Sequence, residues 1–311
     1  MILDGKRVLI TGGTGSLGRA ILKRAQDEGW NTEFTVFSRT ETKIAQVKSN
    51  FPNVRAIIAD VRDLDWLRTN MPGHDVVIHA AALKIVPVAE INVKEAITTN
   101  VEGTKNVAIA CAEAEVERAI LISSDKSCGP TYYGVTKRLG EGLLREANNW
   151  RSTEFLSVRY GNVLRSSNSL VSLFERLIAE DKPFTITDFR MTRFWLSMQQ
   201  AIDLILYALE NSKAGTITVP KAPAMSVVDL AKTLDPDREL VEIGIRPGER
   251  LNETLIVREE AQHTIDIGSH FVIYPPQDRV ESNLPFQFEY TSDKPAHWLT
   301  PDEMRDLLKD S

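Results

Sequence analysis

Three glycines set between a short apolar run and an amphipathic segment constrain the fold of this chain more than any other feature. Residues 7–10 form the kind of β-branched apolar run that fills a parallel strand covered on both faces. Gly12, Gly15 and Gly18 follow in a GxxGxxG spacing, and apolar residues then recur at helical intervals between residues 16 and 29. A strand, a tight glycine turn and a helix in this order leave free N–H groups at the helix start, where an anionic group can bind.

The same alternation continues along the first half of the chain. Further strands are expected at residues 33–37, 55–59, 75–79, 118–123 and 154–160, with helices at 42–49, 93–113 and 132–149. This order predicts an α/β fold with a doubly wound parallel sheet of the Rossmann type.

After about residue 164 the pattern changes to helices at 169–180 and 199–211, a lone strand at 216–219 and a proline-punctuated remainder. We therefore expect an NADP-binding domain over residues 1–165 and a smaller substrate-capping domain over 166–311. The strand at 216–219 is a candidate to return to the main sheet.

Composition narrows the class of protein. The 311 residues are 42% hydrophobic, and 37 basic against 43 acidic residues give a net charge of −6, which argues against a nucleic-acid partner. Cys111 and Cys128 are too few for a disulfide framework and form no metal-binding CxxC pair. The longest mainly apolar stretch, 76–89, is shorter than a membrane span and contains His79 and Lys84. We expect a soluble cytoplasmic protein without a bound metal, a nucleic-acid partner or a membrane partner.

The glycine loop predicts a site for a dinucleotide pyrophosphate, because glycines allow backbone N–H groups to approach the phosphates closely. A glycine turn without a ligand is the alternative. The residues expected to contact the cofactor here are Gly12, Thr14, Gly15, Ser16, Leu17 and Gly18.

The end of the second strand predicts which dinucleotide binds. Folds that select NAD usually place a carboxylate there, whereas this chain has Ser38 and Arg39, with Lys43 one helical turn further. One hydroxyl and two cations suit the 2′-phosphate of NADP, because a guanidinium can donate two hydrogen bonds to phosphate oxygens. The alternative is that Arg39 is an ordinary surface charge.

Later segments complete the predicted cofactor site. Asp60 and Val61 follow the third strand, where an adenine edge would lie. The small residues after the fourth strand leave room for the nicotinamide ribose, and they are Ala80, Ala81 and Ala82. Asn100 is either an amide that orients a loop facing the cofactor or a polar residue inside a helix, and the sequence does not decide between these roles.

The fifth strand is followed by a candidate catalytic group. Ser124, Asp125 and Lys126 end this strand, and the next helix carries Tyr133 and Lys137 on one face. Lys137 is expected to lower the pKa of the Tyr133 phenol and to hold the nicotinamide ribose. Tyr133 would then remove a proton from a substrate hydroxyl while a hydride leaves the same carbon. Aromatic packing beside an exposed lysine is the alternative.

Several long segments carry a family resemblance that spans nearly the whole chain: TGGTGSLG, HAAALKIVPVAE, SSDKSCGP with YYGVTK, RYGNV, ITDFRMTRFW, IGIRPGERLNE and EYTSDKPAHWL. The chain resembles the inverting UDP-N-acetylglucosamine 4,6-dehydratases (PseB/CapE type) of the extended short-chain dehydrogenase superfamily. The resemblance implies dehydration of a UDP-N-acetylhexosamine with NADP recycled in each turnover. It also implies a homo-oligomer formed through the helices at 93–113 and 132–149.

The resemblance further implies roles for individual residues. Protonated Asp125 would expel the hydroxyl at carbon 6, and neutral Lys126 would take the proton at carbon 5. That role requires burial and nearby positive charge to lower the pKa of Lys126 by several units from ~10.4. A surface ion pair between these two residues is the alternative. The residues expected to hold the nucleotide sugar are Lys84, which also lies near the cofactor, and Asn162, Thr187, Arg193, Arg246 and Glu249.

Two positions depart from the family pattern. Ser167 stands where the family has an arginine, and Arg165 appears two positions earlier. The loop at 127–132 is one residue shorter than usual, which leaves a different sugar substituent open. The rival functions are a non-inverting dehydratase or one acting on another nucleotide sugar, a nucleotide-sugar 4-epimerase, and an NADP-binding sensor without turnover.

Overall fold

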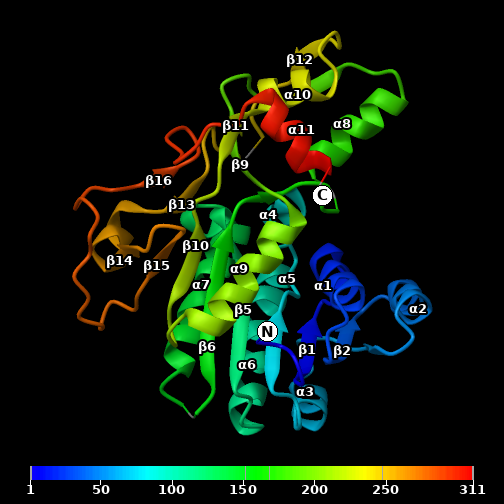
Figure 1. Ribbon diagram of the computed structural model, residues 1–311, viewed down its shortest axis with the longest axis vertical. Helices are drawn as coiled ribbons and strands as arrows, with labels where there is room; N and C mark the ends of the chain where they lie inside the picture. Colours follow the sequence, from blue (N-terminus) through cyan, green and yellow to red (C-terminus); the bar gives the residue numbers. More distant parts are fainter. Residues whose placement is uncertain (1, 151, 168, 247, 310–311) are drawn as a thin grey trace.

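The apolar runs expected to be strands pair into one twisted sheet in a computed structural model that describes residues 2–150, 152–167, 169–246 and 248–309 (Figure 1). From edge to edge, its nine strands are β3 (Arg55–Ile58), β2 (Glu33–Ser38), β1 (Arg7–Thr11), β4 (Val76–His79), β5 (Arg118–Ser124), β6 (Glu154–Tyr160), β10 (Ile217–Pro220), β15 (His270–Ile273) and β14 (Thr264–Asp266). The strands from β3 to β10 are parallel, and β15 and β14 each pair antiparallel with the preceding strand. This arrangement is the doubly wound sheet that the sequence predicts.

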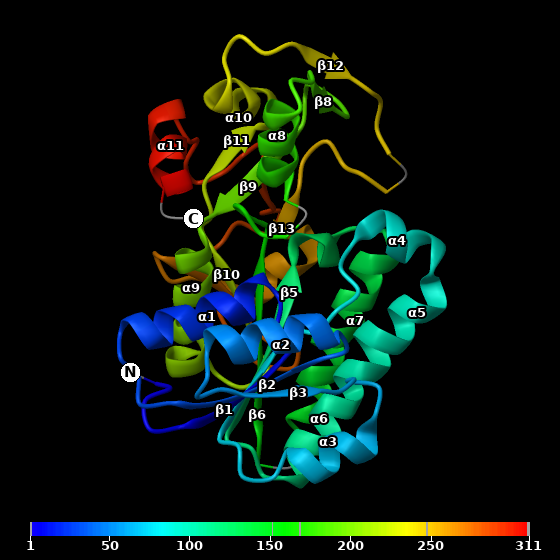
Figure 2. The ribbon, with the colours of Figure 1, turned by 90° about the vertical axis from the view of Figure 1, so that its right-hand side faces the viewer.

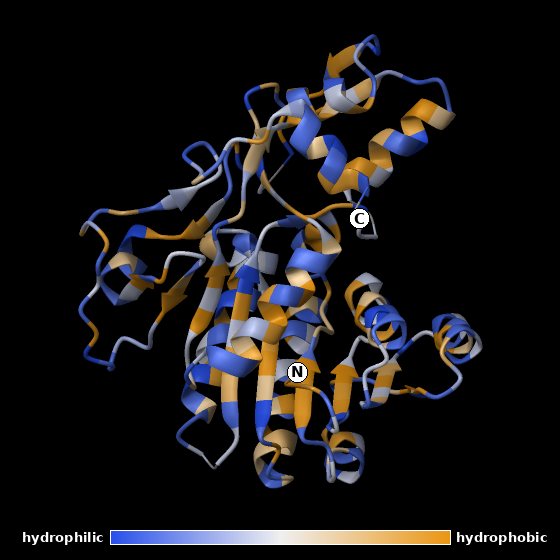
Figure 3. Cartoon of the chain, viewed as in Figure 1, coloured by the Kyte–Doolittle hydropathy of each residue, from blue (hydrophilic) through white to orange (hydrophobic). Residues whose placement is uncertain are grey.

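Helices cover both faces of the sheet (Figure 2). One face packs against α1 (Ser16–Asp27), α2 (Glu41–Asn50) and α9 (Met198–Asn211), and the other against α3 (Leu64–Asn70), α6 (Gly103–Glu113) and α7 (Tyr132–Ala147). Successive side chains of β1 enter opposite layers, since Val8 and Ile10 lie in the core with α1 while Leu9 lies in the core with α3. Burial on both faces explains why residues 8–10 of β1 are all apolar, and Figure 3 shows this strand mainly in the hydrophobic colour.

A smaller region lies beyond the carboxyl ends of the strands and has its own core, which includes Phe174, Trp195 and Met304. Its helices are α8 (Leu170–Ala179), α10 (Val227–Leu234) and α11 (Pro301–Lys309). Its strand groups are β7 (Asn162–Val163) with β9 (Thr192–Leu196) and β11 (Ala224–Ser226), β8 (Phe184–Ile186) with β12 (Leu240–Glu242), and β13 (Thr254–Ile256) with β16 (Tyr290–Thr291).

The strand expected at 216–219 lies in the main sheet as β10, where it pairs with β6. The strands β14 and β15 extend the main sheet, and the helix α9 packs against one of its faces. Residues after 165 therefore contribute elements to both regions. In the main sheet, β10 covers the backbone edge that β6 would otherwise expose.

The helix expected over residues 93–113 is interrupted. It consists of α5 (Val93–Ile97), the π-helical turn η1 (Thr98–Glu102) and α6, and α4 (Val86–Ile91) precedes it. Two short 3₁₀ turns, η2 (Asp125–Cys128) and η3 (Arg258–His263), complete the elements. Within the described ranges, no helix combines the length and the apolar character that a bilayer crossing needs.

Candidate active site

A cavity of about 750 Å³ opens at the carboxyl ends of β1, β2, β4, β5 and β6, beneath the smaller region. The strand order reverses between β1 and β4, and ligands of doubly wound sheets bind at this switch point. The sequence-predicted residues that line the cavity are Gly12, Thr14, Gly15, Ser16, Leu17, Gly18, Ser38, Arg39, Lys43, Asp60, Val61, Ala80, Ala81, Ala82, Lys84, Ser124, Asp125, Lys126, Tyr133, Lys137, Asn162, Arg193, Arg246 and Glu249.

The glycine loop has the shape that a pyrophosphate needs. Gly12 has a φ of +65°, and a Cβ there would lie 2.9 Å from the Ala81 backbone. A Cβ on Gly18 would lie 2.2 Å from the Gly13 carbonyl oxygen, so neither position tolerates a side chain. Gly15 is the N-cap of α1 and offers no side-chain acceptor, which leaves the first N–H groups of the helix open to an anion.

Charged side chains at the end of β2 form a network that the sequence did not predict. Arg39 lies 3.2 Å from Glu95 and 4.0 Å from Asp60, while Arg62 pairs with both of these carboxylates. Burial alone would raise the pKa of Asp60, but the hydrogen bonds from Arg62 outweigh it and hold the pKa below its ordinary value. Asp60 is therefore engaged by Arg62 as well as facing the cavity. Ser38 Oγ is buried and has no hydrogen-bond partner among the described residues.

A buried hydrogen-bond chain supports the loop after β4. The Ala81 N–H donates to Thr11 Oγ1 at 3.0 Å, and Thr11 Oγ1 lies 2.7 Å from His79 Nδ1. His79 Nε2 lies 3.0 Å from Thr104 Oγ1, which itself donates to the Asn100 carbonyl oxygen. Because the Thr104 hydroxyl donates its proton to that carbonyl, its oxygen accepts from His79. The proton of the neutral His79 ring is therefore assigned to Nε2. Burial lowers the pKa of His79 to about 3 and keeps the ring neutral.

Asn100 orients the same loop without lining the cavity. Its Oδ1 accepts from the Leu83 N–H at 2.8 Å, and its Nδ2 donates to the Leu83 carbonyl oxygen and to Thr136 Oγ1. The π-helical turn places Asn100 at this point, as π-helical turns often do at functional sites. Of the two roles that the sequence left open, the contacts are those of the loop-orienting amide.

The catalytic candidates meet where η2 packs against the start of α7. Thr131 caps α7 by accepting from the Gly134 N–H at 3.0 Å, and Tyr133 and Lys137 lie one turn apart, both buried. A Cβ on Gly134 would lie 1.9 Å from the Lys126 carbonyl oxygen. Glycine at 134 therefore lets the helix approach the turn that carries Asp125 and Lys126.

The expectation that Lys137 lowers the pKa of Tyr133 is wrong for this arrangement. Burial and the nearby Asp125 carboxylate raise the pKa of the Tyr133 phenol, although a hydrogen bond with Ser124 acts in the opposite direction. Burial lowers the pKa of Lys137 to about 8, with Glu141 opposing the change. The phenol is therefore a weak acid here, because its ionised form loses solvation on burial and is repelled by the Asp125 carboxylate.

Asp125 and Lys126 form a buried ion pair that includes a third residue. Lys126 Nζ lies 3.1 Å from Asp125 Oδ2 and 2.7 Å from Glu253 Oε1. Burial raises the pKa of Asp125, and this agrees with a protonated acid. Burial would lower the pKa of Lys126, but the two carboxylates outweigh it and raise the pKa above its ordinary value. The expected depression of the Lys126 pKa is therefore wrong, because the sequence did not show Glu253 beside it.

The predicted sugar-binding residues differ in how far their side chains are already hydrogen-bonded within the protein. The Arg193 guanidinium donates to the carbonyl oxygens of Thr192 and Leu251 at 2.7 and 2.9 Å, so much of it is already engaged by the protein. The Arg246 N–H donates to Glu249 Oε2 at 3.1 Å in a loop at the rim. Lys84 lines the cavity, and burial lowers its pKa.

Thr187 is not among the described residues that line the cavity. Its hydroxyl donates to Met191 Sδ at 3.0 Å, because the chain after β8 turns back through the ion pair of Asp188 and Arg190.

The comparisons with known proteins agree with this geometry. A family described as "Polysaccharide biosynthesis protein" matches residues 8–275. The chain is 38% identical to "UDP-N-acetylglucosamine 4,6-dehydratase (inverting)" of Campylobacter jejuni subsp. jejuni serotype O:23/36, over 99% of this chain and 98% of the relative. The chain belongs to this dehydratase family. Its fold is accordingly that of the nicotinamide dinucleotide-binding extended short-chain dehydrogenases.

Other relatives place the dehydratase family among enzymes of nucleotide sugars. A "UDP-glucose 4-epimerase" of Rickettsia felis is 39% identical over 91% of this chain and 86% of its own. The X-ray structure of Pen from Bacillus thuringiensis has a TM-score of 0.91 at 32% identity and covers 100% of this chain and 98% of its own. A dTDP-glucose 4,6-dehydratase from Streptomyces venezuelae, solved with NAD bound, shares the fold with a TM-score of 0.70 at 21% identity, over 79% of this chain and 86% of its own.

The departures from the dehydratase family's pattern have structural outcomes. Arg165 has a φ of +51° and donates to Glu175 and to the Leu308 carbonyl oxygen, so its side chain joins α8 and α11. It is not among the described residues that line the cavity. Ser167 does line it, and its N–H donates to Ser16 Oγ at 3.0 Å at the end of the cavity that the glycine loop lines.

An arginine lies against the loop at 127–132, which the sequence indicates is shorter than usual. Arg250 Nη1 donates to the Cys128 carbonyl oxygen at 3.1 Å and lines the cavity beside Gly129. Sequence reasoning missed Arg250 and Glu253 as site residues. Both lie inside the segment IGIRPGERLNE, which also holds the predicted residues Arg246 and Glu249, and this shared segment was the signal available.

Proposed function

We propose that this chain removes water from a UDP-N-acetylhexosamine, with UDP-N-acetylglucosamine as the best candidate. The product would be a 4-keto-6-deoxy sugar nucleotide inverted at carbon 5, with NADP bound and recycled in each turnover. The observation that carries the proposal is the pairing of Asp125 and Lys126 at the end of β5, in the same cavity as Tyr133 and Lys137. The activity for which the Campylobacter relative is named supports the substrate.

The residues present fit NADP. The glycine loop offers open N–H groups at α1, and the unpartnered Ser38 hydroxyl lies with Arg39 and Lys43 at the far end of the cavity. These groups would hold the pyrophosphate and the 2′-phosphate respectively. Arg39 would then exchange its contact with Glu95 for one with phosphate oxygens.

The chain's own residues divide the proton transfers between them. When bound, the nicotinamide ring supplies the means of taking a hydride from carbon 4 and returning it to carbon 6. Tyr133 in its ionised form would accept the proton of the carbon 4 hydroxyl, and the ketone that forms acidifies the proton at carbon 5. Lys126 takes that proton, while Asp125 donates its own to the departing carbon 6 hydroxyl, which leaves as water. A proton from solvent, added to carbon 5 from the opposite face, would then complete the inverted product, and Tyr133 would return the carbon 4 proton to solvent.

The acid and base also distinguish this proposal from a 4-epimerase. Epimerisation oxidises and reduces carbon 4 alone, so it leaves carbon 6 oxygenated and gives Asp125 and Lys126 no reaction to perform. A buried Asp125 whose pKa is raised by burial is suited to donate a proton to a leaving hydroxyl.

Mass spectrometry and proton NMR test the proposal directly. Incubation with UDP-N-acetylglucosamine in heavy water should give a product lacking one water, with deuterium at carbon 5 and an L-configured 4-keto sugar. Asp125→Asn should slow water loss by a factor of about 10² or more, since general acid catalysis contributes about that much. A 4-epimer that retains the carbon 6 oxygen, or a D-configured product, would overturn the proposal.

We also infer a cytoplasmic homo-oligomer and a substrate-capping role for the smaller region. Exposed apolar side chains on α5 and α7, among them Ile97, Val135 and Leu139, support subunit contact through these helices. Arg193, Arg246 and Glu249 reach the cavity from the smaller region and support its capping role.

A further inference from the structure

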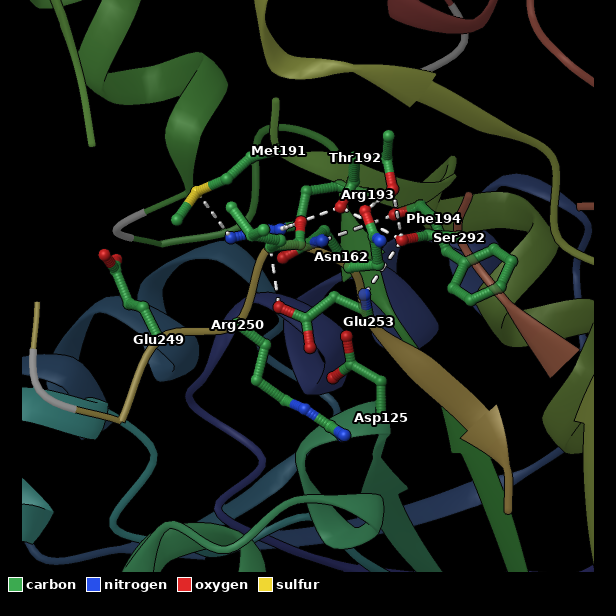
Figure 4. A network of polar contacts seen from close by, with 12 residues as sticks. Asp125, Asn162, Met191, Thr192, Arg193, Phe194, Glu249, Arg250, Glu253 and Ser292 are labelled. Carbon is green, nitrogen blue, oxygen red and sulfur yellow. Dashed lines mark hydrogen bonds and ion pairs between the residues drawn. The ribbon is translucent and has the colours of Figure 1, made fainter. Parts of the chain in front are cut away.

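Glu253 is a buried carboxylate that reaches the catalytic pair from a distant part of the chain. It is 2% exposed, lines the cavity, and directly precedes β13. Its Oε1 lies 2.7 Å from Lys126 Nζ and 3.3 Å from Arg193 Nε, and Figure 4 shows it between Arg193 and Asp125. The roles assigned above to the proton transfers do not use it.

The backbone around Glu253 is held rigidly. Its N–H donates to Ser292 Oγ at 2.8 Å, and its carbonyl oxygen accepts from the Ser292 N–H at 2.8 Å. The Ser292 hydroxyl also donates to the Thr192 carbonyl oxygen at 3.0 Å, so three segments of the smaller region meet here. The carboxylate is therefore fixed in place, because an anchored backbone presents it toward Lys126.

The charges around this carboxylate are a defined set. Lys126, Arg193 and Arg250 face it as cations, and Asp125 faces it as a second acid. Burial alone would raise the pKa of Glu253, but Lys126 and Arg193 outweigh it and hold the pKa below its ordinary value. Glu253 therefore remains an anion beside Lys126.

One proton shared by Asp125 and Lys126 can be placed in two ways. In the first form, the carboxylate faces an ammonium across the 3.1 Å contact. In the second form, a carboxylic acid faces a neutral amine, which is the pair of states that the proposed dehydration needs. Moving the proton across this contact interconverts the two without any exchange with solvent. The proposed dehydration can therefore proceed only in the pH range where Asp125 and Lys126 together hold one proton.

We propose that Glu253 is a positioning residue that holds the Lys126 amine against Asp125 and sets the pH range in which this pair carries a single proton. Its negative charge raises the proton affinity of both partners and stabilises the ammonium formed when Lys126 takes the carbon 5 proton. The link to turnover rests on the proposed dehydration, whereas the link to the Lys126 charge does not.

Glu253→Gln removes the charge and keeps the size of the side chain. Both limbs of the pH–rate profile should move to lower pH by about one unit or more, as expected when an adjacent charge is lost. Glu253→Asp, which keeps the charge but withdraws it from Nζ, should move the profile in the same direction by less. Glu260→Gln is the matched control, because Glu260 is also buried and ion-paired, at 2.7 Å from Arg159 instead of Lys126. It should leave the position of the profile unchanged.

A second readout needs no turnover. Acetic anhydride labels neutral amines, so the pH dependence of Lys126 labelling, followed by peptide mass spectrometry on the full-length protein, reports the charge of this one residue. The pH of half-maximal labelling should fall in Glu253→Gln and stay unchanged in Glu260→Gln. If it falls but no dehydrated sugar forms, the positioning role stands and the proposed function fails. If dehydration proceeds while both the labelling and the rate profile of Glu253→Gln match the wild type, the positioning role is wrong.

Discussion

Residues at the two ends of the cavity show how a neighbour decides what a charged side chain can do. The carboxylates of Asp125 and Glu253 lie beside Lys126 and keep it an ammonium despite burial. At the other end, Arg39 shares Glu95 with Arg62, so its guanidinium is held near the cavity before any phosphate binds. In both cases the residue that the sequence singled out lines the cavity, and the sequence did not predict its partner.

Arg39 allows a prediction about the choice of dinucleotide. Arg39→Ala should weaken NADP binding by about thirtyfold, because a hydrogen bond to a charged group contributes about 2 kcal/mol. NAD binding should change little, since NAD has no 2′-phosphate. Titration calorimetry with both dinucleotides measures the ratio of affinities. Arg62→Ala is the control, because Arg62 pairs with the same carboxylates but is not among the described residues lining the cavity, and it should change both affinities by the same factor.

Among the elements, the contact between α7 and η2 has the strictest geometry. The helix begins at a threonine cap and passes so close to the turn that Gly134 has no room for a side chain. The turn presents Asp125 and Lys126, and the helix presents Tyr133 and Lys137, so their relative placement depends on this contact.

Two glycines of α7 allow a matched test of that contact. Gly134→Ala should destabilise the protein by about 1–3 kcal/mol and impair turnover, because the new methyl group overlaps the Lys126 carbonyl. Gly142→Ala has nothing within 4 Å of the new Cβ and should stabilise the helix by about 0.5–1 kcal/mol. Chemical denaturation measures both changes. Equal effects of the two substitutions would contradict the close approach.

The whole molecule buries ionisable groups between its layers, and His79 makes its stability depend on pH. The unfolded chain binds a proton on this ring below about pH 6.5, whereas the folded chain keeps it neutral down to about pH 3. The contribution is therefore complete above pH 6.5 and is lost as the pH falls toward 3, by up to about 1.4 kcal/mol per pH unit. Denaturation at several pH values should show a shallower slope for His79→Gln than for the wild type. Parallel slopes would contradict the burial of a neutral ring.

Assembly is the second property of the whole molecule. Val135 and Leu139 are 43% and 51% exposed on the outer face of α7, and we expect a second copy of the chain to cover them. The double substitution Val135→Glu with Leu139→Glu should lower the mass measured by sedimentation equilibrium. Ile58→Glu, at a site 54% exposed at the end of β3, is the control and should leave the mass unchanged. A wild-type chain that sediments as a monomer would contradict this prediction.

Local patterns in the sequence were enough to predict the parallel strands β1 to β6, most of the covering helices and the glycine loop, whereas β14, β15 and α3 were not predicted. Strand and helix periodicities are properties of short segments, and Gly12 and Gly18 stand where the backbone passes too close to another segment for a side chain. The order of these segments along the chain then leaves few ways to build a parallel sheet. Tyr133 and Lys137 could be paired for the same reason, since two residues four positions apart on a helix lie on the same face.

The tertiary structure alone decided the features that depend on residues far apart in the chain. Glu253 meets Lys126, β14 and β15 extend the main sheet, and Glu95 meets Arg39 only after the chain has folded. Burial and distance set the pKa of each group, and neither can be read from its neighbours in sequence. The sequence thus determined the architecture and the kinds of groups at the site, while folding determined the charges with which those groups meet a substrate.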